Sequence, residues 1–175
     1  HLSELNWLET VGDFEGNLDK IVDAMGKAQR DGAHLLVTPE LSLCGYYPGD
    51  YLLEPNFIES QLKARERLIE LSRTTPKLAI VFGFAALNEM QGKRLHNAIE
   101  VVKNGEVLLR YTKQLLPTYN IFDERRHFEP GTQPGVLTLK TESEQFKLGF
   151  VICEDAWDED EKSYLHSPLG QLKSQ

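Results

Sequence analysis

The chain has 175 residues, of which 41% are hydrophobic and 26% charged, which predicts one globular domain with a sizeable core and excludes a disordered or fibrous chain. The net charge of −8 combines 27 acidic with 19 basic residues and no basic stripe, so no nucleic-acid partner is expected. There are only two cysteines, no apolar run near the roughly 20 residues of a membrane span, and no secretory signal, which favours a cytoplasmic protein without a membrane partner.

Two helices are predicted in the first half of the chain. Residues 15–30 carry apolar side chains at helical spacing, and Gly32 marks the end of this segment. Pro55 suits a first helical position, and the second helix is expected over residues 55–73. After Trp157, a short stretch near residues 169–172 is the only part compatible with a helix, and no strand is evident there.

Strands dominate the rest of the chain. We expect them at residues 5–8, 34–38, 78–87, 94–102, 106–111, 136–141 and 146–152. Asn104 and Gly105 form the kind of pair that connects a β-hairpin. Together these elements predict an α/β protein built in layers, with a mostly antiparallel or mixed sheet. No nucleotide-binding glycine motif occurs, and neither the histidines nor the cysteines form a metal signature, so no metal is predicted.

Three ionisable residues lie where a predicted apolar strand gives way to a loop: Glu40, Lys113 and Cys153. Strand ends at one rim of a sheet can bring distant side chains together. A cysteine thiol has a pKa of about 8.5, so a nearby lysine ammonium favours the reactive thiolate. The same ammonium can stabilise an oxyanion, and a carboxylate can carry the proton. The three residues together predict an amide-cleaving site.

Taken singly, each residue also has an ordinary structural interpretation. Cys153 would be a small buried hydrophobic side chain, Lys113 a surface lysine and Glu40 a loop carboxylate. Cys44 lies in the loop after Glu40 without a lysine motif of its own, and we interpret it as structural.

The local sequences favour the catalytic interpretation. Residues 39–46 (PELSLCGY), 113–119 (KQLLPTY) and 149–155 (GFVICED) resemble the three signatures of the nitrilase, or carbon–nitrogen hydrolase, superfamily, which carry its Glu–Lys–Cys triad in this order. Residues 45–53 (GYYPGDYLL) and 119–128 (YNIFDERRHF) are similar to segments of glutamine-dependent NAD synthetases. The resemblance covers about residues 5–157.

The resemblance implies a nitrilase-like α/β/β/α sandwich that acts as a glutaminase through a thioester. It implies Glu40 as general base and acid, Lys113 as stabiliser of the thiolate and the oxyanion, and Cys153 as nucleophile. Glu124 matches a carboxylate that supports the lysine, and the backbone N–H of Glu154 is expected to assist the oxyanion hole. The residues expected to line the glutamine pocket are Tyr46, Tyr119, Phe122 and Glu154.

The likeness fails after Trp157. We assign residues 1–158 to the N-terminal portion of the glutaminase domain and 159–175 to a divergent polar tail, and we expect a sandwich that is incomplete at its C-terminal side. The resemblance implies a C-terminal synthetase domain as partner, absent here, and ATP and magnesium only for that domain. This chain is expected to need no cofactor. An incomplete sandwich would expose apolar surface, so a homo-oligomer is expected.

Three functions remain open at this stage. The first is hydrolysis of glutamine that supplies ammonia for NAD synthesis from deamido-NAD. The second is a stand-alone nitrilase-type amidase acting on another small amide. The third is a catalytically silent fragment that serves as a structural or interaction module.

Overall fold

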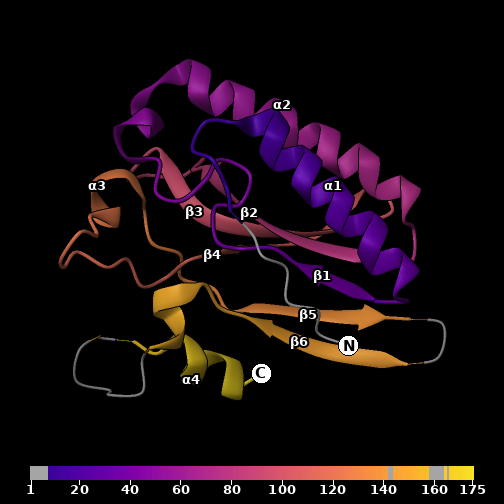
Figure 1. Cartoon of the computed structure of the whole chain (residues 1–175). Helices are drawn as coiled ribbons and strands as arrows, with labels where there is room; N and C mark the ends of the chain where they lie inside the picture. The colour runs from indigo at the N-terminus through magenta and orange to yellow at the C-terminus, as the bar shows by residue number, and fades with distance from the viewer. Residues whose placement is uncertain (1–7, 142–143, 158–163, 165) are drawn as a thin grey trace. The chain divides into compact units, whose positions relative to one another are not determined.

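The computed structural model describes residues 8–141, 144–157, 164 and 166–175 (Figure 1). The chain divides into two compact units, which are described separately. The first unit takes in the chain up to Ala85 together with Ile99–Leu108. The second consists of Ala86–Ala98 and Leu109–Gln175.

Two long helices belong to the first unit. Helix α1 (Phe14–Arg30) begins at Asp13, whose side chain accepts a hydrogen bond from the N–H of Gly16, and helix α2 (Pro55–Leu71) has a proline in its first turn. Figure 1 shows the two helices side by side. The buried positions of α1 repeat at helical spacing, as expected for the stripe that faces the core: Leu18, Ile21, Ala24, Met25 and Ala28.

A buried glutamine attaches α2 to the sheet. The side chain of Gln61 accepts from the N–H of Ala85 at 2.9 Å and donates to the carbonyl of the same residue at 2.8 Å. Both polar ends of this amide are therefore satisfied inside the first unit, as a buried polar side chain requires.

The larger sheet has the strand order β1-β2-β3-β4. Its strands are β1 (Leu35–Val37), β2 (Ala79–Leu87), β3 (Leu95–Lys103) and β4 (Glu106–Thr112). Strands β1 and β2 are parallel, with Leu35 opposite Ala79. Asn104 and Gly105 connect β3 to β4 with φ angles of 51° and 79°, the left-handed conformation that a two-residue hairpin turn needs.

The second unit contains an antiparallel hairpin of β5 (Gly135–Lys140) and β6 (Gln145–Phe150), with Leu137 opposite Leu148. The described residues of this unit also form short helical elements: α3 (Glu124–His127), the 3₁₀ helix η3 (Cys153–Ala156) and α4 (Pro168–Lys173).

The mixed α/β class, both long helices and the short helix near residues 169–172 are confirmed. Six of the seven expected strands are present, with ends shifted by one or two residues. One boundary is wrong: β6 ends at Phe150, so Cys153 begins a 3₁₀ helix instead of closing a strand. Most of the strand expected at residues 5–8 lies outside the described residues, and Leu8 belongs to no strand. The sequence also did not predict α3 or the 3₁₀ helix η1 (Gly49–Leu53).

Candidate active site

Lys113 follows β4, and its backbone is held from two directions within the second unit. Its N–H donates to the carbonyl of Asn97 at 2.9 Å, and its carbonyl accepts from the N–H of Gly131 at 2.8 Å. A Cβ atom at Gly131 would lie 2.4 Å from the carbonyl oxygen of Thr112, so this approach requires glycine. The Lys113 residue is 1% exposed. The lysine expected to be catalytic is therefore a buried, fixed group and not a surface lysine.

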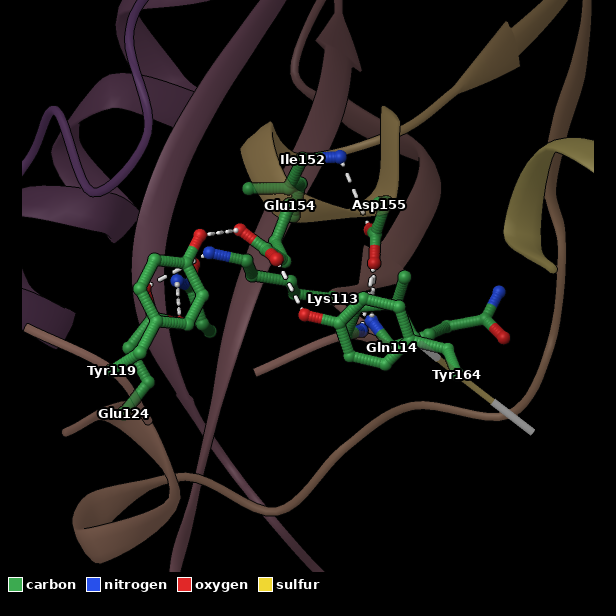
Figure 2. Close-up of polar contacts among 10 residues, drawn as sticks. Lys113, Gln114, Tyr119, Glu124, Ile152, Glu154, Asp155 and Tyr164 are labelled. Carbon is green, nitrogen blue, oxygen red and sulfur yellow. Dashed lines mark hydrogen bonds and ion pairs between the residues drawn. The ribbon is translucent and has the colours of Figure 1, made fainter. Parts of the chain in front are cut away.

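The ammonium of Lys113 is paired with Glu124 (Figure 2). The Lys113 Nζ atom lies 2.9 Å from Oε1 of Glu124, and both side chains are 1% exposed. Asn97 Nδ2 donates to the second carboxylate oxygen at 3.4 Å, and the N–H of Glu124 donates to the carbonyl of Pro117 at 3.2 Å. Because buried charges are costly alone, each member of the pair reduces the desolvation cost of the other. The result is a positive charge held in one place.

Cys153 is exposed, and its backbone adopts a left-handed conformation with a φ of 44°. Residues with a side chain adopt this region infrequently, and such outliers gather at functional sites. A sharp turn in which the chain passes from extended backbone into a helix presents the nucleophile of many hydrolases to solvent. Cys153 occupies such a turn, because Ile152 is extended and η3 follows at once.

The Cys153 turn is closed by the next residues of η3. The N–H of Asp155 donates to the carbonyl of Ile152 at 3.0 Å, and the N–H of Ile152 donates to Oδ2 of Asp155 at 3.1 Å. This reciprocal pair resembles a capping box, in which two unpaired backbone donors at a helix start are satisfied together. The left-handed residue therefore sits inside a rigid turn.

Glu154 follows the cysteine and is 6% exposed. Two phenols reach its carboxylate from two sides in Figure 2: Tyr119 donates to Oε2 at 2.8 Å, and Tyr164 donates to Oε1. The ring of Tyr119 also meets the ring of Phe122 edge to face, with centroids 5.7 Å apart. Three of the expected pocket residues are thus gathered in the second unit: Tyr119, Phe122 and Glu154.

The electrostatics of Tyr119 connect this cluster with the cysteine and the lysine. The hydrogen bond to Glu154 raises the pKa of Tyr119, and desolvation and the charges of Glu154 and Cys153 act in the same direction. The charge of Lys113 lowers that pKa. Through its hydrogen bond to Glu154, the Tyr119 phenol lies beside the turn that carries Cys153.

Glu40 belongs to the first unit, where it is half-buried at the start of a turn. The next residue, Leu41, has a φ of 52°. Gly83 of β2 lies against this turn, and a Cβ atom there would be 2.3 Å from the Leu41 backbone nitrogen. The hydroxyl of Ser42 accepts from the N–H of Gly83 at 3.1 Å and is 2.7 Å from the hydroxyl of Thr38. These contacts fix the backbone that carries Glu40.

The other expected residues of the first unit are Tyr46, which is 37% exposed, and Cys44, which is fully buried. Burial raises the pKa of the Cys44 thiol to about 12, so this cysteine is protonated at neutral pH. That environment agrees with a structural role for Cys44 and leaves Cys153 as the exposed thiol of the pair.

A profile of carbon–nitrogen hydrolases matches residues 3–165 of this chain. The chain belongs to the carbon–nitrogen hydrolase family. The match runs to residue 165, past Trp157, after which the likeness was expected to fail. This membership confirms the resemblance of the chain to the carbon–nitrogen hydrolase superfamily.

The relatives of this carbon–nitrogen hydrolase include glutamine-dependent NAD⁺ synthetases. The one from Synechocystis sp. is 38% identical over 182 residues, covering 99% of this chain and 31% of that protein. The structure of the enzyme from Acinetobacter baumannii has a TM-score of 0.77 and 30% identity, covering 96% of this chain and 29% of that one. The chain thus spans about a third or less of these relatives.

A shorter protein of the same fold is also similar. It is a variant of the amidase from Nesterenkonia sp. AN1, described as showing covalent addition of the acetamide moiety of fluoroacetamide at the active-site cysteine. It is 30% identical, has a TM-score of 0.68, and covers 85% of this chain and 53% of that one. These structural neighbours confirm the nitrilase type of the α/β fold.

The second unit of this carbon–nitrogen hydrolase therefore gathers most of the expected site residues, whereas Glu40 and Tyr46 belong to the first. That Glu40 meets Lys113 and Cys153 stays a prediction. Sequence reasoning did not predict a role for Tyr164 or the hydrogen bonds of Asp155, although Asp155 lies in the third signature, residues 149–155. Within the described ranges, no helix is long and apolar enough to cross a membrane, and no three His, Cys, Asp or Glu side chains gather to hold a metal ion.

Proposed function

We propose that this chain is the glutaminase part of a glutamine-dependent NAD synthetase and hydrolyses the side-chain amide of glutamine to glutamate and ammonia. The observation that carries the proposal is the exposed Cys153 thiol on a left-handed turn. Asp155 of the same turn accepts hydrogen bonds from Gln114 and Leu115, which directly follow the buried lysine of the Lys113–Glu124 pair. The match to synthetases along 99% of the chain supports glutamine as the substrate.

In the first half of the reaction, the Cys153 thiol transfers its proton to the carboxylate of Glu40, and the sulfur attacks the amide carbon. The amide oxygen gains the negative charge, which the Lys113 ammonium and the N–H of Glu154 stabilise. The carbon–nitrogen bond then breaks, and the proton held by Glu40 leaves with the nitrogen as ammonia. A thioester between Cys153 and the glutamyl group remains.

In the second half, Glu40 takes a proton from water, and the hydroxide attacks the thioester carbon. The same oxyanion stabilisation applies, because the charge forms at the same oxygen. The carbon–sulfur bond breaks, the sulfur regains a proton, and glutamate leaves. Atoms balance as glutamine plus water giving glutamate plus ammonia.

The proposed pocket over the thiol consists of Tyr46, Tyr119, Phe122 and Glu154. The support for it is the packing of the Tyr119 and Phe122 rings and the hydrogen bond from Tyr119 to the Glu154 carboxylate. Aromatic rings can cover the methylene groups of glutamine, while a held carboxylate can accept hydrogen bonds from its polar end.

We further propose that the released ammonia is used by a synthetase domain that converts deamido-NAD to NAD with ATP and magnesium. The support is the identity of the relatives, of which this chain spans 31% or less in the two cases above. We also propose a cytoplasmic location and a homo-oligomeric state. Light scattering of the purified chain measures the oligomeric state.

A second candidate is an amidase that acts on a different small amide. The similarity to the Nesterenkonia amidase, of which the chain covers 53%, favours it. The same cysteine chemistry would serve, with a different group in the pocket.

Ammonia release from glutamine and from a panel of small amides, including acetamide and asparagine, separates the two. We expect release from glutamine, its abolition in Cys153→Ala, and nearly unchanged release in Cys44→Ala. Faster release from another amide would favour the amidase. No release from any amide by a folded chain would favour a structural module.

A further inference from the structure

A second carboxylate of the cysteine turn has no role in the proposed reaction. Asp155 is 0% exposed, and its side chain accepts four hydrogen bonds. Oδ1 accepts from the backbone N–H groups of Gln114 at 3.0 Å and Leu115 at 2.8 Å. Oδ2 accepts from the N–H of Ile152 at 3.1 Å (Figure 2) and from the hydroxyl of Tyr111 at 2.7 Å.

The four donors come from two stretches that carry the proposed chemistry. Gln114 and Leu115 directly follow Lys113, and Ile152 directly precedes Cys153. One carboxylate therefore holds the backbone beside the lysine and the backbone beside the cysteine at the same time. An ionised carboxylate offers about four acceptor positions, so the geometry of Asp155 uses its full capacity.

Capping η3 alone does not account for this arrangement. A cap requires only the bond to Ile152, whereas the other three bonds reach residues 40 or more positions away in the chain. Removing a carboxylate from water is costly, and burial raises the pKa of Asp155 above its ordinary value, although the four donors offset part of that rise. All four partners are neutral, so the charge of Asp155 is held by hydrogen bonds and not by an ion pair with any of them.

We propose that Asp155 is a positioning residue that locks the Cys153 turn onto the Lys113 segment and so sets the separation of thiol and ammonium. This inference rests on the proposed function, because it assigns the purpose of the lock to the cysteine–lysine chemistry. It predicts that removing hydrogen bonds of Asp155 on the cysteine side changes the reactivity of Cys153, and that an equal loss of stability elsewhere in the network does not.

Two substitutions in the same network separate positioning from structure. Asp155→Asn keeps the shape and one oxygen, which can still accept from Gln114 and Leu115, but the new NH₂ group faces the N–H of Ile152. The bond on the cysteine side is thereby lost. Tyr111→Phe also removes one hydrogen bond from the buried carboxylate, yet it leaves all three backbone bonds in place. Both variants are expected to melt at a lower temperature than the wild-type chain.

The measurement is the alkylation rate of Cys153 by iodoacetamide across a pH series. It is followed by mass spectrometry of the 175-residue chain well below the melting temperature of each variant. We expect Asp155→Asn to react about tenfold more slowly at neutral pH, with its rate profile shifted to higher pH because the thiolate has lost part of its cationic partner. Tyr111→Phe should keep the wild-type profile. The titratable groups of the surrounding cluster are unchanged in every protein: Lys113, Tyr119, Glu124, Glu154 and Tyr164.

An unchanged profile in Asp155→Asn, or equal shifts in both variants, would overturn the proposal. If Asp155→Asn does not fold, Asp155→Ser is measured by the same criteria, since a hydroxyl with a water molecule can replace part of the lock. The outcome is separate from the proposed function: a chain that hydrolyses no amide can still show the shift, and an active glutaminase can still lack it.

Discussion

The two cysteines of this chain lie in opposite environments. Cys153 is exposed on a left-handed turn, whereas Cys44 is fully buried with a pKa raised to about 12. Sequence reasoning distinguished them through their neighbours, and the burial of Cys44 agrees with that choice. The left-handed conformation of Cys153 was not predictable, because cysteine has no preference for it and the surrounding turn imposes it.

The Cys44 thiol should make stability depend on pH under alkaline conditions. Its pKa in the folded state exceeds the ordinary value of 9.0, so the native state holds the proton more tightly than the unfolded chain does. The contribution of the Cys44 thiol to the free energy of unfolding therefore has its full value below pH 9.0. It is lost as the pH rises toward 12, which lowers the free energy of unfolding by up to about 4 kcal/mol. Urea unfolding at several pH values should show a steeper fall for the wild-type chain than for Cys44→Ala. Parallel curves would contradict the assigned pKa.

The pair of Lys113 and Glu124 should matter for both stability and chemistry. Glu124→Gln removes a buried negative charge 2.9 Å from a buried ammonium, so we expect a loss of about 3 kcal/mol in the free energy of unfolding. We also expect slower ammonia release, because the lysine loses the carboxylate that fixes it. Urea unfolding and the ammonia assay check the two effects.

An exposed ion pair provides the matched control. Glu59 lies 2.7 Å from Lys63 on α2, with side chains 63% and 72% exposed. Glu59→Gln should leave both the unfolding midpoint and the activity nearly unchanged, because solvent screens exposed pairs. An equal effect of the two substitutions would mean that the burial of the Lys113 pair has no energetic consequence.

At the residue scale, the hydrogen-bond partners of Asp155 could not be predicted from the sequence. The sequence places it in a family signature, but its donors Tyr111, Gln114 and Leu115 lie 40 or more residues away, and only the folded chain reveals them. The same applies to Tyr164, which meets Glu154 from a segment that we interpreted only as a divergent tail.

At the scale of elements, hydrophobic periodicity predicted the long helices and strands and missed the short helical elements. Helix α1 and strand β2 each bury a regular face or a continuous apolar run, and both were predicted within one residue. Elements of four or five residues, such as α3 and η1, complete at most one or two turns and leave no periodic signal. The loss of regular pairing after Phe150 had no sequence marker either.

The turn that carries Glu40 depends on a glycine in β2. Gly83→Ala would place a Cβ atom 2.3 Å from the Leu41 nitrogen and 3.0 Å from the Glu40 carbonyl carbon. Because both are backbone atoms, the turn must shift, and we expect a loss of about 1–3 kcal/mol in stability together with slower ammonia release. Thermal unfolding and the ammonia assay measure these effects.

Gly26→Ala in α1 is the corresponding control. A Cβ atom there meets only the end of the Arg30 side chain at 3.5 Å, an ordinary contact. Alanine is favoured over glycine inside a helix, so this variant should be as stable as the wild type or up to about 1 kcal/mol more stable. Normal activity in Gly83→Ala would argue against a requirement for this turn.

At the scale of the whole molecule, the family and the fold class followed from sequence because three motifs occur in the right order. Structural similarity with a TM-score of 0.77 to a synthetase confirms that fold. The match to the Synechocystis relative covers 99% of this chain but only 31% of that protein. The activity of the longer enzymes is therefore a proposal for this chain. Motifs predict which residues act, whereas contacts that hold them, such as the Asp155 lock, follow only from the folded chain.

The central claim is that Cys153 is a nucleophile directed at glutamine. It is tested most directly by incubating the native chain with a glutamine analogue that carries a diazoketone in place of the amide, followed by peptide mass spectrometry. We predict one adduct per chain, on Cys153 and not on Cys44, with slower labelling when glutamine is present. Labelling of Cys44 to the same extent, or no labelling of a folded chain, would contradict the claim.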